Sequence, residues 1–527
     1  MAYHDHKWLF DHTLLIFLCL LFVQTLSHAG PSWAKAYGDS YYNELPKSIQ
    51  QTSDGGYIVA GWSWDFEYSD SFVTKLDSEG KVKWQIHGEN GYMTLFDINS
   101  VRPTSDEGHI CCGYFRNFST SIGGAFVFKL DSSGNISWQK TYEGGCASSI
   151  WGTSDGGYIL GGGCGVLRLD SSGNILWQKA FSGLDGNGSV IQQTEDGGYI
   201  LAGTTRPTDL ELENVWIIKL SQTGDFVWGR KLGTSDYDYF TSLCQTADGG
   251  YVLTGYTVTI TDNSRKSQAW MARLDSSGNL LWQKAFGKAN ECGLSSIQQT
   301  ADAKFILAGG TFSYGAGDSD TFVLSLDSFG NILWQNTYGG SDYDSADHIQ
   351  QTIDGGYVVA GTTNSFGTFV PYKYDLFVMK LDVNGNLDSS CDIASPTSIK
   401  SFDSVLVLYD LEAEITATSI VAKDGSLITV PWQATETTIC EDLPQVSKVI
   451  RASSPFRLKV SGQNFHSDVQ VFIGSDTTPW SNVSYKSQEL LVLKKGTTLK
   501  NNFPKGVPVE IKVVNGDGGS ATYTYTR

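Results

Sequence analysis

The sequence lacks the spacing of apolar residues that is typical of amphipathic helices. It also lacks the CxxC and HExxH patterns that hold zinc, and its eight histidines are scattered. Basic residues are fewer than acidic residues, 37 against 56, so the formal charge is −19. This charge argues against nucleic acid and against anionic membrane surfaces as partners. These absences favour an all-β protein without a zinc centre.

A repeated unit in two halves takes the place of helices. The first half reads IQQTEDGGYILAG from Ile191, and the second half reads LDSSGNLLWQKAF from Leu274. Each half occurs seven times. The first half begins at Ile49, Val101, Ile150, Ile191, Leu243, Ile297 and Ile349, and the second at Leu76, Leu130, Leu169, Leu220, Leu274, Leu326 and Leu381.

Each unit predicts four β-strands. An Asp-Gly or Gly-Gly turn separates two short alternating runs in the first half, which is a strong hairpin pattern. A Ser-Gly-Asn turn separates the two strands of the second half. Four strands in every ~40–50 residues are typical of a propeller blade. The sequence therefore predicts a seven-bladed β-propeller over residues 30–390.

The last unit predicts how the ring closes. Six units carry a tryptophan on the fourth strand, but the unit that begins at Leu381 ends before any tryptophan. The segment WAKAYG from Trp33 is similar to the missing WQKAFG. We expect this N-terminal strand to complete the seventh blade beside the strand around Phe377, so that no sheet edge is left open at the closure.

The N-terminus predicts export. The apolar run from Leu14 to Val23 and the small residues Ser27 and Ala29 are typical of a signal peptide over residues 1–29. The run is too short to span a bilayer comfortably. We expect a mature chain without a transmembrane span that is secreted, extracellular or attached to the cell surface, with the periplasm as another compartment.

Eight cysteines remain after such cleavage, in a compartment where disulfides form. Cys111 and Cys112 are adjacent on a predicted strand, so their side chains point to opposite faces and we expect them to be small buried apolar residues. The other candidates are two pairs, one of which follows the propeller and one of which lies in the loops of the third blade: Cys391 with Cys440, and Cys146 with Cys164.

Loops that combine carboxylates with aromatic rings are the candidate ligand sites. Carboxylate oxygens suit Ca²⁺, and aromatic faces suit sugar rings. No segment matches the twelve-residue EF-hand loop, so a Ca²⁺ site would need several loops. The alternative is that these acids cap turns and the tyrosines pack between blades. The candidates are Asp236, Asp238, Asp342 and Asp344 for Ca²⁺, and Tyr237 and Tyr343 for a ligand.

A second candidate is the pair Trp62 and Trp64 in the first blade. The two rings could form a carbohydrate platform, or they could pack over the edge of the blade. We expect loops of this kind to lie on the face with the longer connections, where a protein or glycan ligand would bind.

Two family resemblances follow from the repeats. The run LDSSGNILW is similar to the tryptophan-docking motif of pyrroloquinoline-quinone dehydrogenase propellers, although it is one residue shorter between Asp170 and Gly173 and lacks the threonine. This resemblance implies a structural role for tryptophan more than a quinone cofactor. From Trp33 to Asp388 the chain resembles a group of secreted bacterial and archaeal repeat proteins, which implies an exported, non-catalytic propeller.

The region after the propeller divides into two parts. Residues 391–449 lack the repeat and predict a β-rich connector. Residues 450–527 resemble an IPT/TIG domain, an immunoglobulin-like β-sandwich, through Gly462-Gln463-Asn464-Phe465, Ile473-Gly474 and Asn515-Gly516-Asp517-Gly518. In exported proteins this resemblance implies a spacer or adhesion module.

Three functions remain open from the sequence. The first is a non-catalytic binding or adhesion protein, with no catalytic residue and no cofactor other than a possible Ca²⁺. The second is a propeller enzyme, either a quinone-dependent oxidoreductase or a carbohydrate-active enzyme. The third is a structural component of a surface layer or filament.

Overall fold

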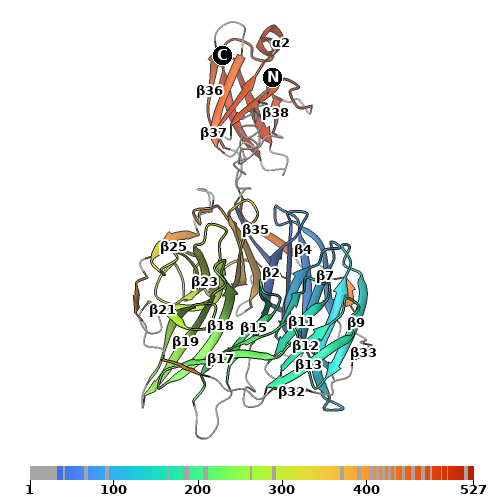
Figure 1. Cartoon of the computed structure of the whole chain (residues 1–527). Coiled ribbons are helices and arrows are strands. Elements are labelled where there is room, and N and C mark those ends of the chain that lie inside the picture. The colour runs from blue at the N-terminus through green and yellow to red at the C-terminus, as the bar shows by residue number, and fades with distance from the viewer. Residues whose placement is uncertain are drawn as a thin grey trace, which may run out of the picture.

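The computed structural model describes residues 32–38, 42–64, 69–88, 94–145, 147–162, 165–181, 189–205, 212–261, 264–287, 292–367, 373–387 and, with short gaps, 393–527. Between residues 401 and 447 it describes the backbone alone. The described residues form an all-β chain with seven antiparallel sheets arranged as the blades of a propeller, followed by further sheets at the C-terminal end (Figure 1). The predicted fold class is confirmed.

In blades 1 to 6 the four repeat strands are consecutive in the chain, and in blade 7 the fourth strand is the N-terminal strand β1. Blades 1 to 4 contain β2 (Asn43–Gln51), β3 (Tyr57–Trp64), β4 (Ser69–Leu76) and β5 (Val82–Gly88); β6 (Thr94–Pro103), β7 (His109–Asn117), β8 (Gly123–Leu130) and β9 (Ile136–Glu143); β10 (Ser149–Gly152), β11 (Tyr158–Gly162), β12 (Gly165–Leu169) and β13 (Ile175–Phe181); and β14 (Val190–Gln193), β15 (Tyr199–Thr204), β16 (Val215–Leu220) and β17 (Phe226–Gly233).

The other three blades follow the same order. They contain β18 (Tyr237–Gln245), β19 (Tyr251–Thr261), β20 (Ser264–Leu274) and β21 (Leu280–Phe286); β22 (Cys292–Gln299), β23 (Phe305–Thr311), β24 (Asp320–Leu326) and β25 (Ile332–Tyr338); and β26 (Asp344–Gln351), β27 (Tyr357–Thr363), β28 (Asp375–Leu381) and β1 (Trp33–Gly38).

The N-terminal strand closes the ring. Strand β1 pairs antiparallel with β28, and Ala36 lies opposite Phe377. The first described strand and the last repeat therefore share one sheet, which confirms the predicted exchange.

Tryptophan and glycine join each blade to the next. The indole of one blade covers the glycine of the Ser-Gly turn in the following blade, so that a Cβ atom on Gly224 would lie 2.7 Å from the ring of Trp177. The indole Nε1 of Trp33 also donates a hydrogen bond to the Ser78 carbonyl at 3.2 Å. The contact occurs seven times around the ring, as Trp33–Gly80, Trp84–Gly134, Trp138–Gly173, Trp177–Gly224, Trp228–Gly278, Trp282–Gly330 and Trp334–Gly385.

Replacement of Gly224 by alanine tests this docking, and Gly249 supplies a matched control. Both glycines have a positive φ, 78° and 80°, so either alanine carries about 1 kcal/mol of backbone strain. A Cβ on Gly249 meets nothing closer than Ser276 at 3.8 Å, whereas Gly224→Ala also forces the Trp177 indole away. We expect Gly224→Ala to lower the free energy of unfolding by about 1–3 kcal/mol more than Gly249→Ala in urea titrations. Equal losses would contradict the docking role.

A polar network fixes the hairpin turn inside each blade. In blade 1 the buried Lys75 ammonium lies 2.8 Å from Asp54 Oδ1 and 2.7 Å from Thr52 Oγ1. The same Thr-Asp pair recurs in all seven blades. In blade 6 a serine, Ser325, replaces the lysine, and Lys304 from the turn itself reaches the blade's aspartate at 2.7 Å.

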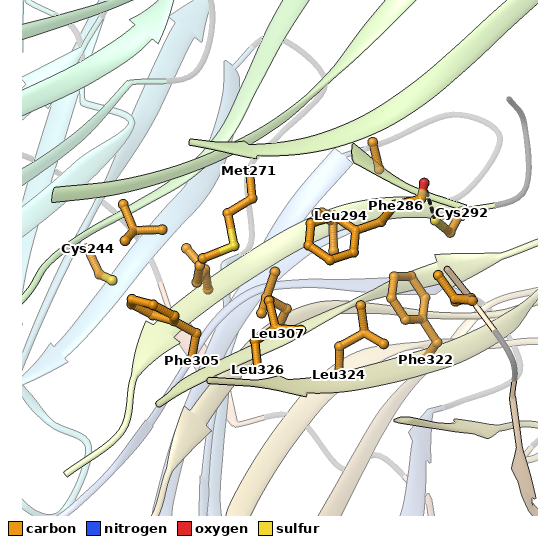
Figure 2. Close-up of a cluster of buried hydrophobic side chains, with 14 residues drawn as sticks. Cys244, Met271, Phe286, Cys292, Leu294, Phe305, Leu307, Phe322, Leu324 and Leu326 are labelled. Atoms are coloured by element: carbon orange, nitrogen blue, oxygen red, sulfur yellow. Dashed lines mark hydrogen bonds between the residues drawn. The ribbon is translucent and has the colours of Figure 1, made fainter. Parts of the chain in front are cut away.

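Apolar clusters fill the spaces between neighbouring blades. Figure 2 shows the cluster between blades 5 and 6, where Met271 and Phe286 of one blade face Phe305 and Leu324 of the other. Each blade is packed on both faces by such contacts, so most positions of the middle two strands of a blade are buried, including polar ones such as Thr74 and Lys75.

A belt of seven short strands, which we define as residues 394–441, surrounds the propeller. The belt strands are β29 (Ala394–Pro396), β30 (Ser401–Asp403), β31 (Val407–Asp410), β32 (Ile415–Ala417), β33 (Ala422–Asp424), β34 (Thr429–Pro431) and β35 (Thr435–Glu441). They pair with the outermost strands of blades 6, 5, 4, 3, 2, 1 and 7 in turn. The belt therefore runs round the ring against the order of the repeats and ends on β1 (Figure 1).

The belt pairs with part of the outer edge of every blade, over three or four residues in blades 1 to 6 and over most of β1 in blade 7. Nothing in the composition of residues 391–449 predicted where these strands would lie. An uncovered edge strand presents unpaired N–H and C=O groups to other molecules, so we expect a mature chain that ends at residue 390 to self-associate. A chain that ends at residue 441 keeps the belt and serves as the control.

Size-exclusion chromatography with light scattering measures this effect. The shorter chain is expected to elute as aggregates or as higher oligomers, and the longer chain as the same species as the full protein. A monodisperse shorter chain with an unchanged unfolding midpoint would show that the belt protects nothing.

The C-terminal residues form two further sheets. One contains β36 (Gln445–Ala452), β37 (Arg457–Gln463), β40 (Leu490–Leu493) and β39 (Val483–Ser487), and the other contains β38 (Gln470–Ile473), β41 (Pro508–Val514) and β42 (Ser520–Thr526). Both contribute to one buried cluster, with Leu458 and Leu491 from the first and Val471 and Ile511 from the second. The short helix α2 (Gly496–Asn501) adds Leu499 to this core.

Candidate binding site in the central channel

The inner strands of the seven blades surround a polar cavity of about 650 Å³. Side chains alternate along a strand, so the isoleucine of each IQQT run points between blades while its neighbours point into the cavity. Ile49 is buried in a cluster of blades 7 and 1, and the flanking Ser48 and Gln50 line the cavity. The repeat therefore supplies a lining rich in serine and glutamine.

A bulge adds one lining residue in five of the seven inner strands. The pairing between the first and second strands shifts register at the same place in each of these blades, and a bulge re-aims the extra side chain. The residues at the shifts all line the cavity, and they are Lys47, Asn99, Thr241, Ser295 and Asp347.

The charged lining residues gather on blades 7, 1 and 2. They are Asp347 of β26, Lys47 of β2 and Arg102 of β6, with the titratable His348 beside Asp347, whereas the described lining of blades 3 to 6 has no ionisable Asp, Glu, Lys, Arg or His. The Arg102 guanidinium lies 4.2 Å from the ring centre of Trp151 on blade 3 and donates a hydrogen bond of 2.9 Å to Gln50 Oε1. The cavity thus has one charged side that ends in an aromatic face.

Burial shifts the titration of two of these groups. The pKa of Asp347 is raised to about 6 because the channel interior removes water from its carboxylate, and Lys47 partly opposes this rise. The pKa of His348 is lowered to about 3 by the same loss of water and by the charge of Arg102. At neutral pH the imidazole is therefore uncharged and Asp347 carries a negative charge.

Asp347→Asn tests the environment of this carboxylate. A carboxyl group whose folded-state pKa lies above its unfolded value of about 3.9 stabilises the fold fully below that value and loses this contribution as the pH rises through about 6. Asparagine is neutral throughout, so the variant should be more stable than the parent at pH 7 and nearly equal to it at pH 4. Urea unfolding at both pH values measures the difference, and a gain that is equal at both would contradict the raised pKa.

Glutamine side chains join neighbouring blades around the cavity. The second glutamine of an IQQT run accepts a hydrogen bond from a backbone N–H of the preceding blade, as Gln193 does from Ser154 at 2.9 Å. The same bond occurs at Gln51, Gln245, Gln299 and Gln351. Pro103 and Gly152 stand at this position in blades 2 and 3 and have no side-chain amide, so the series is interrupted beside Arg102 and Trp151.

The candidate acids of blade 5 are used within the fold. Asp238 is fully buried and accepts a hydrogen bond of 2.6 Å from the Thr234 N–H. Asp236 accepts one of 2.8 Å from Thr259 Oγ1. The side chain of Tyr237 is half-buried. Both acids therefore accept hydrogen bonds from groups of their own blade or of the loop before it, as expected for residues that cap a turn or a strand.

The candidate residues of blade 7 differ in exposure. Asp342 is exposed and Asp344 is fully buried. Tyr343 packs edge-on against Tyr374, with ring centres 5.5 Å apart. In the described part of the chain, no group of three or more His, Cys, Asp or Glu side chains has the arrangement of a metal site.

Trp62 and Trp64 are half-buried. They lie two positions apart on β3, so their side chains are on the same face of the strand. The Lys47 ammonium, which belongs to the charged side of the cavity, lies 5.6 Å from the ring centre of Trp62.

The sequence did not predict the lining residues Lys47, Arg102, Trp151, Asp347 and His348 as a set. Their deviation from the IQQT consensus and the extra residue at the bulge are the features by which they could have been found.

The cysteines are described in part. Cys111 belongs to the cluster between blades 1 and 2 and Cys112 to the cluster between blades 2 and 3, both fully buried. The predicted pairs lie outside the described residues, because Cys146, Cys164, Cys391 and the side chain of Cys440 are not described. The predicted signal peptide lies outside them as well. No helix among the residues that are described has the length and apolar character needed to cross a membrane.

Comparisons with known proteins find structural similarities with low TM-scores and no sequence family. No family model and no curated protein matches this chain. A Dyadobacter fermentans protein of unknown function is 12% identical with a TM-score of 0.42, over 66% of this chain and 97% of its own. Sqt1 from Chaetomium thermophilum is 13% identical with a TM-score of 0.38, over 70% and 89%. Regucalcin from Agrobacterium tumefaciens, a calcium-binding protein, is 15% identical with a TM-score of 0.28, over 53% and 88%.

Proposed function

We propose that this chain is a secreted or cell-surface binding protein whose propeller receives a hydrophilic ligand, of which a glycan is the best candidate. The central channel is the observation that carries the proposal. Its volume of about 650 Å³ falls within the range of about 300–1,000 Å³ that is typical of small-ligand sites. Hydroxyl and amide groups from all sides suit a ligand that both donates and accepts hydrogen bonds.

One side of the channel carries an aromatic ring and two cations that would orient the ligand. Trp151 lines the channel with the Arg102 guanidinium over its ring, 4.2 Å from the ring centre, and a sugar ring that packs against this pair would exclude water. Lys47 and Arg102 favour a ligand with a carboxylate or sulfate group at this end.

The lining favours binding over hydrolysis. Asp347 is the one carboxylate among the described residues of the cavity wall, whereas glycosidases use two acids. The C-terminal sheets resemble an IPT/TIG module and would hold the propeller away from its point of attachment. The loops of the longer-connection face would add contacts to a larger partner.

Trp151→Ala tests the proposal. A screen of the mature full-length chain against neutral and acidic glycans identifies the ligand, and titration calorimetry measures its Kd. We expect the variant to bind at least about tenfold more weakly, since a stacked aromatic ring contributes about 1.5 kcal/mol or more.

Phe329→Ala is the matched control for an aromatic ring on the propeller. Phe329 is 70% exposed on a turn of blade 6, outside the lining of the cavity, and its loss should leave Kd unchanged. Equal affinity of the parent and Trp151→Ala, or no ligand for the parent in the screen, would contradict a channel site. Release of a smaller sugar during incubation would identify an enzyme.

A further inference from the structure

Three junctions between neighbouring blades are built to one plan. A glycine follows the outermost repeat strand, because the polar side chain that begins the third strand of the same blade occupies the space of a Cβ. A Cβ on Gly339 would lie 2.1 Å from Asp320 Oδ1. In two of the junctions an acid at the start of the next blade faces the same place, and in the third Glu44 holds the equivalent position on its strand. The three sets are Gly233, Asn214 and Asp238; Gly339, Asp320 and Asp344; and Gly38, Asp375 and Glu44.

Two of these junctions contain a group that offsets the acid. Between blades 4 and 5 the partner of Asp238 is the neutral amide of Asn214, and Thr234 and Thr257 donate hydrogen bonds to both oxygens of the acid. Between blades 7 and 1 the buried Lys373 ammonium lies 3.8 Å from Asp375 Oδ1. Each of these acids therefore has a neutral or cationic neighbour.

The junction between blades 6 and 7 contains two carboxylates. Asp320 is 1% exposed and Asp344 is 0% exposed. The point that a Cβ on Gly339 would take lies 2.1 Å from Asp320 Oδ1 and 2.8 Å from Asp344 Oδ2. The two carboxylates therefore converge on one place, where like charges repel strongly because little water screens them.

The hydrogen bonds of Asp320 and Asp344 involve only one oxygen atom of each carboxylate. Asp344 Oδ2 accepts hydrogen bonds from Gly340 N–H at 2.8 Å and Ser365 Oγ at 2.6 Å, and Asp320 Oδ2 accepts one from Gly317 N–H at 3.2 Å. Oδ1 of each acid is buried without a hydrogen-bond partner among the described residues, and the Thr363 hydroxyl, which also interacts with Asp344, acts to lower the pKa of that acid. No lysine or arginine of the described chain forms an ion pair with either acid. Burial raises the pKa of both acids, that of Asp344 to about 6.

We propose that a Ca²⁺ ion binds between blades 6 and 7 and bridges Asp320 and Asp344, in the role that Lys373 has between blades 7 and 1. Carboxylate oxygens are hard ligands, and Ca²⁺ accepts backbone carbonyls beside them. Two carbonyls lie beside Gly317, the residue whose N–H binds Asp320 Oδ2: a Cβ on Gly317 would lie 2.6 Å from Gly340 O and 2.4 Å from Asp342 O. The ion would fasten the loop after β23 to the start of the last blade.

Thermal unfolding of the full-length chain tests the site, with Ca²⁺ alone as the probe. We expect the midpoint to be higher by about 3 °C or more in millimolar Ca²⁺ than in EGTA. Calorimetry should show one bound ion per chain. Asp320→Asn copies the junction between blades 4 and 5, so it should fold, have a midpoint in EGTA equal to or above that of the parent, because one of the two repelling charges is gone, and lose the response to Ca²⁺.

Asp342→Asn is the matched control, since Asp342 is exposed and its side chain should not be needed for the response. The proposal is overturned if the parent binds no Ca²⁺, or if Asp320→Asn responds as the parent does. A parent that becomes more stable toward pH 5 and ignores Ca²⁺ would show that the two acids share a proton instead. None of these readouts depends on the glycan ligand, so failure of one proposal leaves the other standing.

Discussion

The contact between a tryptophan ring and a turn glycine is the constraint on which the propeller depends. Each of the seven rings lies where a Cβ of the next blade would have to be, so the glycine serves both the positive φ of its turn and the close approach of the indole. The contact occurs once per blade and passes round the whole ring, and Trp33 supplies the seventh member from the N-terminal strand. Fold and closure therefore depend on one repeated contact.

The polar networks show how much the repeat tolerates. In six blades a lysine or arginine of the third strand reaches the aspartate of the hairpin turn. In blade 6 the cation comes from the turn, where Lys304 replaces a glycine, while Ser325 stands in the strand. A cation therefore contacts the turn aspartate in every blade, although most of these aspartates are exposed to solvent, and in blade 6 the lysine is exposed as well. Asp320 and Asp344 differ from them, since both are buried and no cation of the described chain pairs with either.

The belt gives the outer rim a second closure. Its strands begin at intervals of six to eight residues, from Ala394 to Thr435. An extended chain advances about 3.3 Å per residue, so seven residues span about 23 Å from one blade to the next. Strand β1 lies between β28 and the last belt strand, β35. The strand that closes the ring of blades and the end of the belt are therefore in the same sheet. The ring is held at its rim by a segment that belongs to none of the repeats.

A signature of the belt is present in the sequence but is visible only when the fold is known. Small or branched apolar residues recur every seven positions at Ile399, Leu406, Ala413, Ile420, Leu427 and Ala434. Ile399, whose side chain is described, is buried between blades 5 and 6. A period of seven indicates a coiled coil in a helical context, whereas here it matches the interval of six to eight residues between the starts of successive belt strands.

The sequence by itself determined the elements that are local or repeated: the four strands, their turns, the number of blades and the strand that closes the ring. Each of these follows from hairpin chemistry and from counting copies, and a register error would turn every apolar side chain to the wrong face. Only the tertiary structure decided which residues meet across blades. The charged side of the channel, the belt and the convergence of Asp320 with Asp344 join residues of separate blades or segments, and their proximity arises from closure of the ring, not from any spacing along the chain.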